Sequence, residues 1–176
     1  LRQRKSDEMT TLLECTKAIL SFDVFEKTAR HIFDSCTKLT GATAGYVALL
    51  SDDGSENEVL FLEAGGRPCT VDPELPMPIR GLRAVAYETG KAAYDNNFWH
   101  SEWMEFMPEG HVTLDNVLFS PLNIEGKTVG IMGIANKPGG FTEDDARLAT
   151  AFGEMAAIAL NNSRTKDALV NSTTKY

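Results

Sequence analysis

The sequence predicts an α+β domain built on a central antiparallel sheet. Apolar, strand-like runs come in pairs joined by short turns, at residues 46–63 and 116–136, which is the pattern of β-hairpins. Helical periodicity flanks these hairpins at both ends of the chain. The chain has no internal repeat and no βαβ alternation, and this excludes a parallel sheet.

Two helices are expected before the first hairpin. The first occupies the segment up to about Leu20, and the second starts near Ser21 or Asp23, either of which is a suitable N-cap. Gly41 ends the second helix at a C-cap position. Apolar residues recur along this second segment at helical spacing and predict one buried face: Phe25, Ala29, Ile32, Phe33, Cys36 and Leu39.

The first hairpin is expected to pair strands 46–50 and 58–63 across a turn at 51–55. A long crossover loop follows at 67–79, because its prolines preclude both a helix and a central strand.

A short helix at 81–87 and a short strand at 92–95 come next. The segment 96–115 is rich in aromatic residues and methionine but has no periodicity, so we expect an irregular structure there.

The second hairpin pairs strands 116–124 and 128–136, and a final helix runs toward Asn162 or beyond. We expect the core to contain Phe25, Ile32, Phe33, Val47, Leu49, Val117, Leu118, Ile131, Ile134, Leu148 and Phe152.

Composition limits the possible functions. The chain of 176 residues, 43% hydrophobic and 24% charged, fits one globular domain. Its net charge of −8 argues against nucleic acid as a partner, since phosphate contacts need clustered Lys and Arg. No run approaches the roughly 18 apolar residues that cross a bilayer, so we expect no membrane contact.

The chain has three cysteines, and their spacing supports neither a disulfide framework nor a zinc site. Cys36 lies on the apolar helix face, whereas Cys69 lies among prolines in the crossover loop. We expect a cytoplasmic protein and no bound metal. Because the chain begins at Leu1 and lacks an initiator Met, we also expect it to be excised from a longer, multidomain protein.

The most informative segment is 136–145. Thr142 is a good N-cap for the final helix, and Asp145 takes the N3 position of a capping box. The spacing of Asn136-Lys137, then Phe141, then Asp145 resembles the motif of GAF domains, although the Glu that often follows the Asp is Ala146 here. In that family the Lys and Asp pair and tie a loop to the last helix.

The resemblance covers residues 8–165 and implies a GAF-like α+β fold. It implies terminal helices on one face of the sheet and crossover loops that form a pocket on the other. It also implies a sensor module of a bacterial or archaeal signalling protein, of the sensor histidine kinase type in two-component systems, adjacent to PAS domains. Such a module binds a small-molecule ligand, forms a homodimer through its terminal helices and signals to an output domain in cis.

Within the implied pocket, the aromatic and methionine side chains suit a flat apolar ligand. The alternative is that they only roof the sheet. Arg80 and Arg83 flank the start of the short helix, where they can bind a carboxylate or phosphate or instead form surface salt bridges. The pocket candidates are Phe98, Trp99, Trp103, Met104, Phe106, Met107, Arg80 and Arg83.

Cys69 and His111 are candidates for holding haem, with His111 as axial ligand and Cys69 as second ligand or attachment point. The alternative is an idle thiol and an unligated surface histidine. His31 and His100 are interpreted as structural. We expect the two segments that carry Cys69 and His111, 67–79 and 96–115, to meet.

Two other functions stay open at this point. One branch of the GAF fold reduces free methionine sulfoxide with three loop cysteines, but Cys15 and Cys36 fall on helices here. The domain can also be a ligand-free dimerisation spacer whose pocket is filled by Trp99 and Trp103. We predict no catalytic residue, and whether the parent protein is an enzyme, such as a histidine kinase, is left open.

Overall fold

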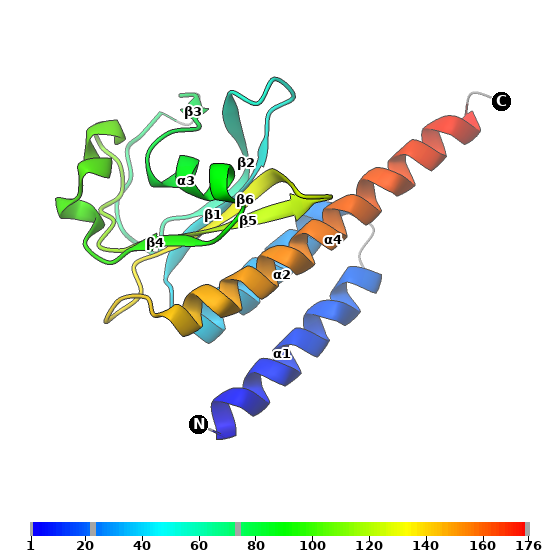
Figure 1. The fold of residues 1–176 in the computed structure, drawn as a ribbon, viewed down its shortest axis with the longest axis horizontal. Helices are drawn as coiled ribbons and strands as arrows, with labels where there is room; N and C mark the ends of the chain where they lie inside the picture. The colour runs from blue at the N-terminus through cyan, green and yellow to red at the C-terminus, as the bar shows by residue number, and fades with distance from the viewer. Residues whose placement is uncertain (1, 22–23, 73–74, 175–176) are drawn as a thin grey trace.

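A computed structural model describes residues 2–21, 24–72 and 75–174 and confirms the α+β fold (Figure 1). Six antiparallel strands form one sheet in the order β3-β2-β1-β6-β5-β4. The strands are β1 (Ala44–Leu50), β2 (Glu56–Glu63), β3 (Met77–Pro78), β4 (Ala93–Asp95), β5 (Val117–Ile124) and β6 (Lys127–Ala135).

The helices lie on both faces of this sheet. They are α1 (Arg2–Ser21), α2 (Phe25–Thr40), α3 (Leu82–Thr89) and α4 (Glu143–Thr174), with short 3₁₀ helices η1 (Phe98–His100) and η2 (Glu102–Phe106). Helices α2 and α4 pack on one face with α1 outside them, while α3 and the 3₁₀ helices lie on the other (Figure 1). The C-terminal part of α4 extends beyond the sheet.

Side-chain alternation along the central strands divides the core in two. Leu118 and Leu122 of β5 point toward the helices, where the side chains of α2 and α4 bury them. Val117 and Phe119 of the same strand point the other way and join Leu82 of α3 and the loop segments. We call the first cluster the helix-side core and the second the loop-side core.

Strand β5 and helix α4 approach each other closely. The buried Ser120 hydroxyl donates a hydrogen bond to the Ala149 carbonyl oxygen over 2.7 Å. A Cβ on Gly153 would come within 2.5 Å of Ser120 Oγ and 2.8 Å of the Pro121 carbonyl oxygen, so a larger residue there would push the helix off the strand. Glycine at 153 therefore sets the spacing between helix and sheet.

Most of the expected core is confirmed, because all its residues except Phe25 and Leu49 are buried. These two are only partly buried and pack on the edge of the helix-side core. Helix α2 begins after Val24, which makes no side-chain cap; Ser21 ends α1, and Asp23 lies outside the described residues.

The crossover loop at 67–79 contains the two-residue strand β3, which pairs with β2 at the edge of the sheet. An edge position tolerates Pro78 because proline lacks the backbone donor that a central strand needs.

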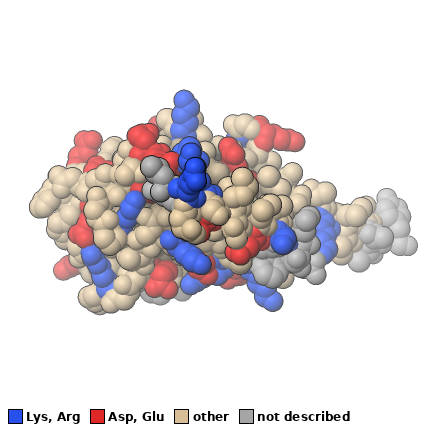
Figure 2. All heavy atoms as spheres, turned by 90° about the horizontal axis from the view of Figure 1, so that it is seen from below, with Lys and Arg blue, Asp and Glu red and all other residues tan. Residues whose placement is uncertain are grey.

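Across the described ranges, no helix is both long and apolar enough to span a membrane. On the face shown in Figure 2, acidic and basic side chains are interspersed over the surface.

Replacing Phe152 by Ala should lower the free energy of unfolding by about 3–5 kcal/mol, because the ring is fully buried in the helix-side core. Chemical denaturation measures this loss. Glu154→Ala on the same helix is the control, since Glu154 is exposed and its replacement should cost much less. Similar losses in the two variants would contradict the helix register.

Candidate ligand site

Asn136 joins strand β6 to the segment that roofs the loop-side core. Its backbone has a φ of 58°, a left-handed conformation that asparagine tolerates better than most residues. Its side chain accepts a hydrogen bond from the Asp115 N–H over 2.8 Å and donates one to the Thr113 carbonyl oxygen over 2.9 Å. The end of β6 and the end of the 96–115 segment are therefore held together.

Lys137 and Asp145 form an ion pair that ties the 138–140 loop to α4. The Asp145 carboxylate also accepts a hydrogen bond from the Thr142 N–H over 2.9 Å. The backbone N–H of Asp145 donates one to the Thr142 hydroxyl over 3.2 Å, and the two bonds together complete the capping box. The Asp145 carboxylate is 0% exposed and the Lys137 side chain is 17% exposed, so this pair is more deeply buried than an ordinary surface ion pair. Phe141 is buried. The Asn96 side chain accepts a hydrogen bond from the Phe141 N–H and donates one to the Phe141 carbonyl oxygen.

The two long segments meet, as the sequence predicted. The Thr70 N–H donates to the Gly110 carbonyl oxygen over 2.9 Å, and Arg67 pairs with Asp115 over 2.8 Å. Cys69 is exposed on the first segment. His111 is partly buried on the second, with Nδ1 2.7 Å from the Val112 carbonyl oxygen.

The aromatic and methionine candidates divide into three groups. Phe98 is buried in the loop-side core, and Trp103, Met104 and Met107 pack against that core. Phe106 carries the exposed Arg80 guanidinium 5.3 Å above its ring centroid. Trp99 is 42% exposed and does not roof the sheet.

Arg83 lies between two aromatic rings on the loop side of the sheet. Its guanidinium carbon is 5.9 Å from the ring centroids of both Tyr46 and Phe119. Nη1 donates to the Pro78 carbonyl oxygen over 3.0 Å, but the buried Nε has no hydrogen-bond partner among the described residues. Neither Arg83 nor Arg80 forms an ion pair with a described carboxylate, so the predicted surface salt bridges are not seen.

The Tyr46 hydroxyl is buried beside Arg83 and also lacks a partner among the described residues. Burial raises the pKa of Tyr46, and both the Arg83 charge and an interaction of the hydroxyl with the Arg83 side chain oppose this shift, although the two groups lie outside the geometry of a standard hydrogen bond. A buried polar group without a hydrogen bond costs about 1–3 kcal/mol of stability. Two such groups beside each other therefore indicate that a further hydrogen-bond partner binds there.

Two further groups feel the Arg83 charge. The pKa of His111 is lowered, first by burial and then by the Arg83 charge, which favours the neutral ring. Burial raises the pKa of Tyr87, whose hydroxyl donates to Asn57 Oδ1 over 2.5 Å. The positive charge of Arg83 therefore lies among neutral side chains.

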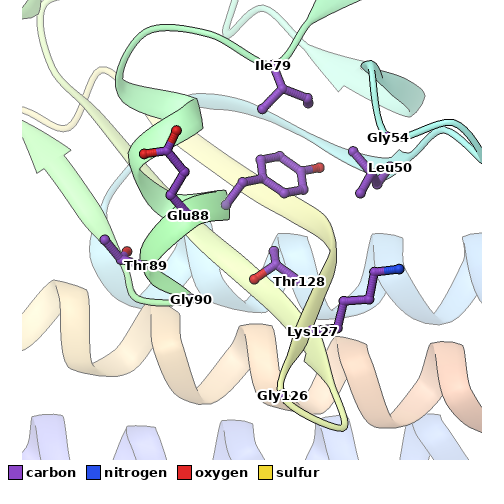
Figure 3. Close-up of a pocket in the computed structure, with 10 residues that line it drawn as sticks. Leu50, Gly54, Ile79, Glu88, Thr89, Gly90, Gly126, Lys127 and Thr128 are labelled. Atoms are coloured by element: carbon purple, nitrogen blue, oxygen red, sulfur yellow. The ribbon is translucent and has the colours of Figure 1, made fainter.

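An open hollow of about 370 Å³ lies at the other end of α3 (Figure 3). It is lined by Leu50, Gly54, Ile79, Tyr87, Glu88, Thr89, Gly90, Gly126, Lys127 and Thr128. None of the site residues predicted from sequence lines it. Asn123 bounds this region by donating to the Gly90 carbonyl oxygen over 3.0 Å.

The three cysteines do not gather at one site. Cys15 and Cys36 are buried in the helix-side core, whereas Cys69 is exposed on the crossover loop. Burial raises the pKa of both core thiols. In the part of the chain that the structure describes, no group of three or more His, Cys, Asp or Glu residues is arranged to hold a metal ion.

The sequence profile described as GAF domain matches residues 25–161. The chain belongs to the GAF domain family. GAF domains are in general regulatory sensor modules that bind small ligands. No curated protein sequence matches the chain significantly.

Solved structures agree on the fold. The GAF domain of a phosphoenolpyruvate-protein phosphotransferase from Coxiella burnetii has a TM-score of 0.77 at 15% identity, covering 93% of this chain and 98% of its own. Free methionine-R-sulfoxide reductase from Neisseria meningitidis, in complex with its substrate, has a TM-score of 0.73 at 14% identity, with 90% and 91% covered.

A GAF domain attributed to a sensor histidine kinase from Pseudomonas syringae pv. tomato has a TM-score of 0.63 at 14% identity, with 97% and 96% covered. At these identities the likeness shows the fold and not the ligand.

Tyr46 was missed from the sequence as a site residue, because it was interpreted only as part of a buried strand. The available signal was alternation: Tyr46 precedes Val47, which faces the helices, so it must face the loops.

Breaking the Lys137–Asp145 pair should be costly. Asp145→Ala is expected to lower the free energy of unfolding by about 3–5 kcal/mol, because it removes one partner of a buried pair. A double-mutant cycle with Lys137→Met should give a coupling of about 1–3 kcal/mol.

Asp144→Ala is the matched control for that cycle. Asp144 is the preceding residue and forms an exposed ion pair with Arg147. Asp144→Ala should therefore lower the free energy of unfolding by no more than about 1 kcal/mol. Zero coupling between the Lys137 and Asp145 substitutions would mean that the pair does not hold the loop.

Proposed function

We propose that this GAF domain is an input module that binds a small ligand over its loop-side core and signals through α4. One observation carries the proposal. A cationic side chain, Arg83, and a buried hydroxyl, that of Tyr46, share an aromatic enclosure and lack partners there among the described residues. A segment that only covered this face of the sheet would need no such polar groups, because apolar side chains can be buried there without a desolvation cost.

Strand β5 offers a route from ligand to output. Phe119 lies against the Arg83 guanidinium on the loop side, and the adjacent Ser120 binds the Ala149 carbonyl oxygen of α4 on the other side. A displacement of Phe119 therefore acts on a strand that is hydrogen-bonded to the output helix.

Asn136 offers a second route. It binds Thr113 and Asp115 of the roof segment, and its neighbour Lys137 binds Asp145 in the first turn of α4. Both routes converge on the N-terminal half of α4, which supports this helix as the output element.

We further propose that the terminal helices form a homodimer and connect to an output domain in cis. Exposed apolar side chains support this on both helices: Met9 and Leu13 on α1, and Ile158 and Leu169 on α4. The Pseudomonas syringae neighbour makes a histidine kinase one candidate output. Analytical ultracentrifugation of the chain tests the dimer, and a monomer at every concentration would refute it.

Haem binding through His111 and Cys69 stays a prediction. A hydrogen bond from Nδ1 to a backbone carbonyl is the support that an axial histidine usually has. The loop-side core, however, is filled by Phe98, Phe119 and the roof side chains, which suits a smaller ligand. Titration with hemin tests it, and the lack of a Soret shift in His111→Ala relative to wild type would exclude His111 as ligand.

A thiol-based reductase is not supported by the geometry, because two of the three thiols are buried on the other side of the sheet from Cys69. Assay with methionine sulfoxide and a thiol reductant is expected to show no turnover.

Hydrogen–deuterium exchange tests the signalling proposal. A ligand found by thermal-shift screening should slow amide exchange in α3 and also change exchange in α4 around residues 149–153. Ser120→Ala should retain ligand binding but weaken the α4 response, because it removes the bond to the Ala149 carbonyl oxygen.

Thr150→Ala is the matched control for Ser120→Ala. It removes a hydroxyl that bonds only within α4, to the Ala146 carbonyl oxygen, so the response should persist. A ligand that protects α3 and leaves α4 unchanged would contradict the proposed output.

A further inference from the structure

The chemistry of the two unpaired groups indicates the kind of ligand. Arg83 uses Nη1 for the Pro78 carbonyl oxygen, and Nε–H and Nη2 have no acceptor among the described residues. These two nitrogens form one edge of the guanidinium, and that edge matches the two oxygens of a carboxylate. The unused part of Arg83 is thus the part suited to bidentate binding.

Tyr46 supplies a third donor beside that edge. Burial raises the pKa of its hydroxyl, so the phenol stays protonated at neutral pH and can donate a hydrogen bond. The neighbouring titratable groups do not compensate the Arg83 charge, because Tyr87 and the His111 ring favour their neutral forms. A monoanion therefore fits the site in both charge and donor number.

We propose that the ligand of this domain is a small carboxylic acid, whose carboxylate binds the Nε–Nη2 edge of Arg83 and accepts a hydrogen bond from the Tyr46 hydroxyl. This inference rests on the proposed ligand-binding function and specifies the ligand class. The rest of the ligand lies toward Trp103, Met104 and Met107, which are apolar and only partly buried. Methionine side chains adapt readily to ligands of different shape.

The carboxylate is favoured over phosphate for a physical reason. A planar group bound to the Nε–Nη2 edge lies in the plane of the guanidinium, which is itself held against the Tyr46 and Phe119 rings. Phosphate is tetrahedral and carries more charge than one guanidinium balances.

Matched probes test the proposal in the 176-residue chain. Benzoate and phenylacetate are each compared at millimolar concentration with their neutral amides and with inorganic phosphate, by thermal shift and by the ¹⁵Nε–¹H resonance of Arg83. At least one acid should raise the melting temperature and shift that resonance, while its amide and phosphate should do neither.

Variants then assign the contact. Arg83→Gln and Tyr46→Phe should each weaken acid binding roughly ten- to hundredfold, the usual effect of losing a hydrogen bond to a charged group. Arg80→Gln is the control, because the exposed Arg80 guanidinium lies over the Phe106 ring. Tyr46→Phe should change the stability of the unliganded protein only slightly, since its hydroxyl makes no hydrogen bond of standard geometry. This variant therefore remains informative even if Arg83→Gln does not fold.

The outcomes separate this inference from the proposed function. If acid and amide bind equally, the carboxylate is refuted but ligand binding stands. If phosphate binds as well as the acids, the site takes any anion and the inference fails. If no probe binds, or if binding survives in both Arg83→Gln and Tyr46→Phe, Arg83 and Tyr46 hold no ligand and the observation behind the proposed function is lost as well.

Discussion

The arrangement of the domain depends on one buried carboxylate. Asp145 caps the first turn of α4 through Thr142 and neutralises Lys137, so a single side chain fixes both the start of the helix and the loop that precedes it. The Lys137 ammonium and the Thr142 backbone N–H both offset the cost of burying this charge. Asn136, next to that lysine, extends the same network to Thr113 and Asp115, and through Asp115 to Arg67. Elements from both faces of the sheet thus share one polar junction.

The two faces differ in how their polar groups are satisfied. On the helix side, the buried Ser120 hydroxyl finds a carbonyl acceptor on α4. On the loop side, Arg83 Nε and the Tyr46 hydroxyl do not find partners among the described residues. The Arg83 and Tyr46 groups support the proposed ligand site on the loop side. Family membership establishes the fold and leaves the identity of the ligand open.

Local patterns in the sequence were sufficient to predict helices α1 to α4 and both hairpins, because caps, glycines and alternation act over a few residues. The Lys137–Asp145 contact was predicted from the resemblance to GAF domains, and the structure confirms it. Three features depend on distant segments and were not predicted. These are the complete burial of the Asp145 side chain, the edge strand β3, and the position of Arg83 between the Tyr46 and Phe119 rings. Tyr46 and Arg83 lie on different elements, and no short-range pattern links them. Their relation became visible only in three dimensions.

The length of α4 gives the attachment at Ser120 a mechanical meaning. Side chains of α4 are buried as far as Leu160, and from there the helix continues to Thr174 beyond the sheet (Figure 1). At about 1.5 Å per residue this projecting arm is roughly 20 Å long, so a tilt of about 5° where it leaves the sheet moves its tip by about 2 Å. Under the proposed signalling route, α4 would act as a lever that converts a small rearrangement near Ser120 into a displacement at its C-terminal end.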